Sequence, residues 1–494
     1  MDWYVAIRRI SECSAALRSC RGGFSDILRT LLGYLDHEDV LVVYAAKEEL
    51  RKALADGRIT ETQCVNSVVI AILDTTSSVW GREASGLRFQ LLQHIVKIPN
   101  GDQAEAPAEL ATELLYLQVV MKNLEKVGVM TRSVFTPRHH SESGDLAVSA
   151  AVPYSVQYEA LAFLSELVKR LDTLKIDTSV QETLIELVTR LMGEVFVTMD
   201  YASQPTFVSC AVLHLVDDFQ RLVKFWKDKR QDGDDVCLET QYSKCIEWCL
   251  VWLNQSSCTS NALRLLNDKE SSNMASQKAL VAKSSRYPFL QQWFLCLSRM
   301  GVTYIEALAA KPKSLNLKWL QPASLGERPR ALERLPTRQQ LFVVLAEQDD
   351  IMIEVLNGIT RSAALVESVD GVRSVLSQQF PSVSAYMIAE YDPDLLFADL
   401  IATLGRDHLV LLDLLISNET QVLEYLLRYT RRLSANWNTS KPKLETGENL
   451  ESVMSVLIRL RLEIDRLVAA DLFPYNAGPL MRRLLAIEHH YEEG

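Results

Sequence analysis

Glycine and proline are scarce in this chain, which has 494 residues but only 19 glycines and 15 prolines. A fold made of β-strands alone needs many turns, and those turns draw on these two residue types. Long apolar runs are also missing. Stretches such as Val68–Leu73 and Leu409–Ile416 are far shorter than the roughly 20 apolar residues of a membrane-spanning helix. The scarcity argues against an all-β fold and against a transmembrane segment.

Cysteine is present but shows no ordered spacing. The nine cysteines are an odd number and are scattered from Cys13 to Cys296, so they indicate no disulfide framework and favour a reducing compartment. The N-terminal residues include Asp2 and no long apolar run, and we expect no signal peptide. We therefore expect a soluble protein of the cytoplasm or nucleus.

Motifs of catalysis and metal binding are also missing. The sequence contains no glycine-rich phosphate loop, no Gly-x-Ser-x-Gly elbow and no His-Glu-x-x-His. Cys245 and Cys249 are one helical turn apart, with Cys237 and Cys258 on either side. Structural zinc sites use closer pairs on knuckle turns, so buried thiols of a helix are the favoured interpretation. We predict no enzymatic activity, no catalytic residue, no metal and no cofactor.

The charge balance is acidic overall but has a local exception. A net charge of −11 makes the whole chain a poor candidate for nucleic-acid binding. Residues 311–337, however, combine basic side chains with a tryptophan. The candidate partner-binding residues in this segment are Lys311, Lys313, Lys318, Trp319, Arg328 and Arg330. Such a segment can contact acidic peptide or a nucleic-acid backbone, and the alternative interpretation is a solvated insertion.

Apolar residues recur with the period of an α-helix along most of the chain. Near the C-terminus, Val453, Leu457, Leu460, Ile464 and Leu467 follow one another at steps of three and four, which predicts a helix with one buried stripe. Similar patterns recur, among others, at 82–97, 155–171, 204–228 and 287–300. No alternating strand pattern stands out between them, so we predict an all-α fold.

Two distant segments share one arrangement. Leu35–Ala46 and Ile416–Leu427 each end a helix, insert a short polar island and begin a second helix. Helix pairs of this kind bury their apolar stripes by stacking, and the open side of the stack becomes a binding surface. We therefore predict a HEAT- or armadillo-like α-solenoid of stacked helical hairpins. An irregular globular helical bundle is the alternative.

Composition also predicts the domain organisation. We expect N-terminal helical repeats, a flexible loop, central helical repeats with a loop insertion, a basic proline-containing linker and a C-terminal helical region. These occupy residues 1–128, 129–153, 154–310 (with the insertion at 254–286), 311–337 and 338–494.

Two acidic or polar islands are interpreted as helix punctuation rather than as sites. The first comprises Glu347, Gln348, Asp349 and Asp350; we expect Asp349 or Asp350 to be the N-cap of the following helix and the other acids to lie in its first turn. The second comprises Ser417, Asn418, Glu419 and Thr420. There we expect Ser417 or Asn418 to cap the second helix of the hairpin, with Glu419 near its positive end.

The C-terminal third carries a family resemblance. The strings "LLISNET…EYLLRY" and "LFPYN", together with the island Glu347–Asp350, resemble the C-terminal region of the Lines family. The N-terminal two-thirds is similar to the helical N-terminal region of that family only in pattern. The motif residues at the C-terminal end are Leu472, Phe473, Pro474, Tyr475 and Asn476.

The resemblance implies a developmental regulator without enzymatic activity. It implies a protein of nucleus and cytoplasm that influences Wnt/Wingless-dependent patterning by binding protein partners such as zinc-finger transcriptional regulators. A nucleic-acid-associated nuclear factor that uses residues 311–337 is the alternative. For the "LFPYN" motif we expect a structural clasp, in which Leu472 and Phe473 pack back onto the last hairpin and Asn476 caps the closing helix; a partner-contact site is the alternative.

Overall fold

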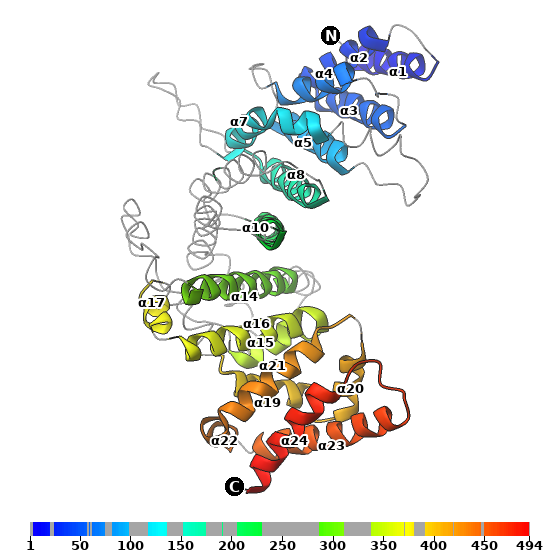
Figure 1. Cartoon of the computed structure of the whole chain (residues 1–494). Coiled ribbons are helices and arrows are strands. Elements are labelled where there is room, and N and C mark those ends of the chain that lie inside the picture. Colours follow the sequence, from blue (N-terminus) through cyan, green and yellow to red (C-terminus); the bar gives the residue numbers. More distant parts are fainter. Residues whose placement is uncertain are drawn as a thin grey trace, which may run out of the picture. The chain divides into compact units, whose positions relative to one another are not determined.

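The computed structural model describes residues 3–19, 24–56, 59, 62–74, 82–97, 117–135, 152–173, 190, 205–229, 286–310, 337–369, 371–379, 391–417, 419–445 and 449–493. Within these ranges the regular structure is helical and contains no strand (Figure 1). The predicted all-α class is confirmed. None of the helices so described is long and apolar enough to cross a membrane.

The chain divides into two compact units, Met1–Cys245 and Ile246–Gly494. The region 154–310, predicted as one set of central repeats, is shared between them. The helices Tyr154–Thr173 (α8) and Thr206–Lys229 (α10) belong to the first unit, whereas Arg286–Ala310 (α14) belongs to the second.

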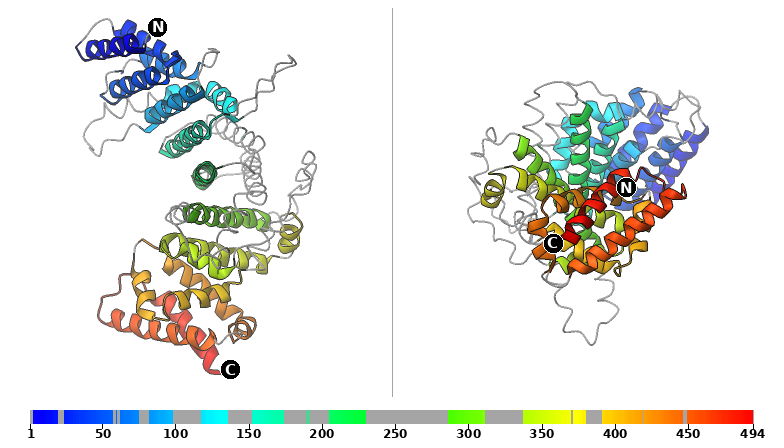
Figure 2. Two further views of the ribbon diagram at one scale, coloured as in Figure 1. Left: turned by 180° about the vertical axis from the view of Figure 1, so that it is seen from behind. Right: turned by 60° about the horizontal axis from the view of Figure 1, so that its bottom comes forward.

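The helices of the first unit form two rows. In the longer row each helix packs against the next, in the order α1, α3, α5, α8 and α10; in the shorter row α2 packs against α4 and α4 against α7. The remaining helices of these rows are α1 (Trp3–Ser19), α2 (Phe24–Gly33), α3 (Val40–Ala55), α4 (Thr62–Leu73), α5 (Arg82–Lys97) and α7 (Leu124–Phe135), and a 3₁₀ turn, Tyr34–Asp36, follows α2. Figure 2 shows the longer row from behind.

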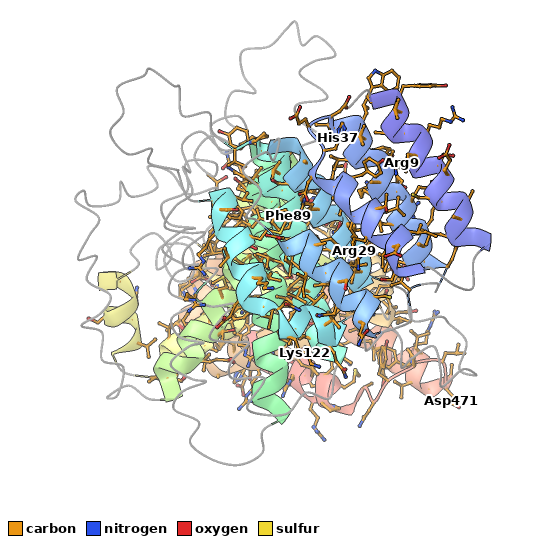
Figure 3. The ribbon with its side chains drawn as sticks, turned by 90° about the horizontal axis from the view of Figure 1, so that it is seen from above. Arg9, Arg29, His37, Phe89, Lys122 and Asp471 are labelled. Carbon is orange, nitrogen blue, oxygen red and sulfur yellow. The ribbon has the colours of Figure 1, made fainter. Side chains whose placement is uncertain are left out.

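Large apolar side chains join neighbouring helices of the longer row. Phe89 of α5 is fully buried and packs against Phe163 of α8, with ring centroids 6.1 Å apart. Figure 3 shows Phe89 among the helices of this unit. Arg88 is buried as well; its guanidinium donates to the carbonyl oxygens of Ala71 and Ile72 and pairs with Asp36. Burial of the apolar side chains, such as Phe89 and Phe163, is the main stabilising contribution to the row.

One predicted loop begins later than expected. Residues 129–135 are the last two turns of α7 rather than the start of the loop 129–153. Val127, Met130 and Val134 are buried at steps of three and four, so the helical stripe continues past the predicted end. Residues 136–151 lie outside the described part of the chain.

The second unit also forms two rows. One row runs α14, α16, α21 and α24, and the other runs α15, α19 and α23, with α20 and α22 packed against α23. These helices are α15 (Arg338–Leu345), α16 (Asp349–Ser368), α19 (Pro393–Thr403), α20 (His408–Ile416), α21 (Val422–Ala435), α22 (Trp437–Glu445), α23 (Asn449–Ala469) and α24 (Gly478–Glu493). A further helix, α17 (Val372–Gln379), contacts α14. In Figure 1, α21 and α24 lie side by side.

The stripe predicted for residues 453–467 is confirmed in most of its length. Val453, Leu457, Leu460 and Ile464 of α23 are buried, whereas Leu467 is only half-buried, two residues before the helix ends. Helix α22 was not predicted, because Pro442 lies inside it and proline disfavours a helix interior.

Candidate functional site

The basic candidate residues between Lys311 and Arg330 lie outside the described residues. The same is true of Cys237, Cys245, Cys249 and Cys258. Binding by residues 311–337 therefore stays a prediction. In the described ranges no three His, Cys, Asp or Glu side chains gather in a way that suits a metal ion.

The acidic island Glu347–Asp350 is exposed and lies at the start of α16. Asp349 and Asp350 occupy the first turn, where negative charge stabilises a helix N-terminus. The prediction that one of them is the N-cap was wrong. The helix begins at Asp349, so Gln348 takes the capping position, and its side chain makes no capping hydrogen bond.

The island Ser417–Thr420 ends one helix rather than starting the next. Ser417 Oγ accepts a hydrogen bond from the backbone N–H of Glu419 at 3.2 Å, and Thr420 Oγ1 donates to the Leu414 carbonyl at 2.8 Å. Helix α21 begins at Val422, behind Gln421, which makes no side-chain cap. The predicted cap by Ser417 is therefore wrong, because its hydroxyl is used at the end of α20; Asn418 lies outside the described residues.

The first half of the "LFPYN" motif does not pack as predicted. Leu472 is 68% exposed, and Phe473 is half-buried with its ring edge-on to that of Tyr475. The cause is the way α23 ends. Asp471 adopts a left-handed conformation (φ 57°), and the Leu472 N–H donates to the Leu467 carbonyl at 2.8 Å. This C-cap geometry points the Leu472 side chain to solvent.

The second half of the motif does join elements. Tyr475 Oη donates to the Ile416 carbonyl at the end of α20, 3.3 Å away. Asn476 Oδ1 accepts from the Gly478 N–H at 3.1 Å, as predicted for the cap of the closing helix. The motif is thus a helix connection with one exposed leucine.

A buried ion cluster links α16, α19 and α21. Asp394 is fully buried, and its Oδ1 accepts a hydrogen bond from Arg432 Nη1 at 2.9 Å. Arg432 Nη2 donates to Glu367 Oε1 at 2.8 Å. Burial alone would lower the pKa of Arg432, but the two carboxylates outweigh it and raise that pKa. Arg432 therefore stays charged inside the unit and binds three helices together.

Aromatic rings surround the ion cluster. Phe397 of α19 stacks on Tyr429 of α21 with ring centroids 4.0 Å apart, and Tyr425 lies one turn away. Burial, with a further contribution from the charge of Asp394, raises the pKa of both tyrosines well above the usual value. These phenols are neutral at every physiological pH. The cluster is thus a structural centre rather than a reactive one.

In the first unit, partly buried polar side chains join neighbouring helices of the longer row. Lys47 Nζ of α3 donates to Gln90 Oε1 of α5, and Gln90 Nε2 donates to Glu159 Oε1 of α8, both at 2.9 Å. At the next interface of the row, Lys169 Nζ of α8 lies 3.3 Å from Asp218 Oδ2 of α10. Polar and charged contacts therefore connect α3 to α5, α5 to α8 and α8 to α10.

Exposed apolar and aromatic side chains lie beside these polar contacts. We call this set the N-terminal open face; it comprises Leu41, Tyr44, Tyr154, Tyr158 and Phe207. Tyr158 and Phe207 are 41% and 47% exposed and meet edge-on, with centroids 5.8 Å apart. The Tyr44 ring also contacts Lys47 Nζ, 4.6 Å from its centroid. Such a surface suits a protein partner, because Tyr and other aromatic residues dominate binding energy at protein interfaces.

Sequence reasoning missed both the ion cluster and the open face. Asp394 and Arg432 are 38 residues apart, and nothing in their local sequence pairs them. The open face had a weak local signal, because Tyr154 and Tyr158 stand four residues apart among polar neighbours.

These features define the class of protein: an all-α protein whose rows of packed helices present exposed faces. Comparison then identifies the family. Residues 323–440 match the family model described as Lines N-terminus, and residues 453–489 match Lines C-terminus. These matches support membership of the chain in the Lines family. The C-terminal third, which we compared with the C-terminal region of that family alone, is thus divided between the two family models. Residues 1–322 lie outside both models.

Two curated proteins show the same relationship. The chain is 34% identical to Protein lines of Drosophila melanogaster over 156 residues, which cover 31% of this chain and 17% of that protein. It is 31% identical to Protein Lines homolog 1 of Homo sapiens over 102 residues, which cover 19% and 13%. The matches thus span less than a fifth of either relative. No solved structure matches the chain.

Proposed function

We propose that the chain is a non-enzymatic adaptor, a HEAT- or armadillo-like array of stacked helical hairpins that binds protein partners. Within the Lines family, the proposal extends to regulation of Wnt/Wingless-dependent developmental transcription, in nucleus and cytoplasm, through partners such as zinc-finger transcriptional regulators. The main support is the N-terminal open face, where aromatic side chains are exposed on α3, α8 and α10, three helices of one row.

The chemistry of that face favours protein over nucleic acid. The buried Lys47 and the exposed Lys169 already contact a polar and an acidic side chain of neighbouring helices, so these two charges are not free to bind a polyanion. The exposed rings offer large contact area at low cost in side-chain entropy. The open side of a stack of helix pairs is also the usual binding surface of such proteins.

The test is the affinity of the purified full chain for a zinc-finger transcriptional regulator, measured by isothermal titration calorimetry. We expect the variant Tyr158→Ala with Phe207→Ala to bind at least about tenfold more weakly, as loss of two central aromatic contacts predicts. Val129→Ser is the matched control, because Val129 is 49% exposed but lies on α7, in the other row. Equal affinity of wild type and double variant, or no binding by the wild type, would contradict the proposal.

A further inference from the structure

In the row α14, α16, α21 and α24, two helix interfaces differ in whether their arginines pair with acids. Between α14 and α16, each arginine meets an acid on the neighbouring helix. Arg299 Nη2 of α14 donates to Glu354 Oε2 of α16 at 2.7 Å, and Arg361 of α16 pairs with Glu306 of α14. Positive charge at this interface is compensated within the unit.

Between α21 and α24 that compensation is missing. Arg431 and Arg482 are exposed and pair with no acid among the described residues. Arg483 Nη1 donates to the backbone carbonyl of Leu427 at 2.7 Å, which ties α24 to α21. The acid of α24 that faces a neighbour, Glu488, pairs with Arg461 of α23 instead.

We call Arg431, Arg482 and Arg483 the arginine seam, because the bond from Arg483 to Leu427 brings α24 to α21 at this point. In a helix the carbonyl of Leu427 accepts from the N–H of Arg431, four residues on. The guanidinium of Arg483 therefore lies within one turn of Arg431, and Arg482 is its neighbour in the chain. One turn beyond Arg482, Leu485 is 48% exposed.

We propose that the arginine seam, with Leu485, docks a short acidic segment of a partner protein that also carries a large apolar side chain. Guanidinium groups bind carboxylates with two parallel hydrogen bonds, and Leu485 supplies an apolar contact beside them. A nucleic acid fits less well, because three arginines are a small site for its repeating phosphates.

This inference concerns the second unit, and the function proposed above concerns the N-terminal open face of the first. The two surfaces share no residue. Substitutions in one leave the other unchanged, so each proposal can fail while the other holds.

The test uses the full chain and a fluorescein-labelled synthetic peptide of Glu and Asp with Leu at every fourth position. Fluorescence anisotropy gives its Kd. We expect saturable binding that weakens as salt is added, and at least about tenfold weaker binding by Arg431→Glu with Arg482→Glu, because two attractive contacts become repulsive. Arg459→Glu is the matched control; Arg459 is also exposed but lies on α23, in the other row.

Three further results decide the matter. The same peptide with Gln and Asn in place of its acids should bind at least about tenfold more weakly. Thermal unfolding should show equal stability for the wild type and both charge-reversal variants, since all three arginines replaced are exposed. A single-stranded oligonucleotide that binds more tightly than the acidic peptide would overturn the proposal in favour of nucleic acid. No peptide binding at low salt, or an equal loss in Arg459→Glu, would also overturn it.

Discussion

Arg432 carries a charge into the interior of the second unit, and its stabilising effect depends on Asp394. Removing one partner of a buried ion pair costs about 3–5 kcal/mol, and Asp394 would keep the weaker contact with Lys443 Nζ, 3.8 Å away. We expect Arg432→Met to lower the free energy of unfolding by about that amount, measured by urea denaturation and circular dichroism. Arg431→Met, next to it but exposed, should change it by less than about 0.5 kcal/mol.

A double variant separates the ion pair from the packing around it. Asp394→Asn with Arg432→Met removes both charges, so the uncompensated carboxylate is gone. We expect it to regain part of the stability lost in Arg432→Met. The stability lost in Asp394→Asn alone is the reference. If the double variant were less stable than Arg432→Met by that full amount, the two residues would not be coupled.

The "LFPYN" motif provides a second test with single residues. Phe473 is half-buried against Tyr475, whereas Leu472 is exposed. Phe473→Ala should therefore lower the Tm by about 2–4 °C, since about 1 kcal/mol shifts the Tm of a unit of this size by that much. Leu472→Ser should leave the Tm unchanged. A drop with Leu472→Ser as large as that with Phe473→Ala would show that Leu472 is buried in solution.

Single residues also mark the limit of prediction from sequence. The buried stripe from Val453 to Ile464 follows from helical periodicity alone, because the spacing of the apolar residues determines which face of the helix is buried. The partner of Arg432 does not follow, since Asp394 approaches it only when α19 packs near α21. Capping was only partly predictable. Asn476 acts on its neighbour Gly478, while the hydroxyl of Thr420 reaches back six residues to Leu414.

At the scale of elements, an ion pair of Lys443 connects α22 to the start of α19. Its Nζ donates to Asp392 Oδ2 at 2.7 Å, and Asp392 Oδ1 accepts from the Asp394 N–H as the cap of α19. Burial would raise the pKa of Asp392, but the hydrogen bonds from Lys443 and from the backbone outweigh it, and the pKa is lowered. The ionised form of Asp392 is thus favoured by folding.

This lowered pKa predicts a pH dependence. A carboxyl whose pKa is lower in the folded than in the unfolded chain contributes stability above the unfolded value, about 3.9, and loses it as the pH falls through the folded value. Lys443→Met removes the principal cause. We expect the urea midpoint of this variant to lie below that of the wild type at pH 7, and the difference to shrink below about pH 4. A constant difference from pH 7 to pH 3 would assign the effect to packing instead.

At the scale of the whole molecule, most of the described helices were predictable in their order, because long amphipathic stripes such as that of α5 depend only on local sequence. The division between the two units was not, since it depends on which helices share a core. Trp293 of α14 and Phe397 of α19 are both buried within the second unit, although about a hundred residues of varied composition separate them.

The division predicts that the second unit folds alone. A fragment of residues 246–494 retains every helix from α14 to α24 and the core they share. We expect it to keep helical circular dichroism and to unfold in one cooperative thermal transition. A fragment that stops at residue 448 lacks α23 and α24, which cover apolar faces of α19 and α21; exposure of those faces should abolish the cooperative transition. If the longer fragment also melted without cooperativity, or the shorter one melted like it, the unit would not be independent as its packing indicates.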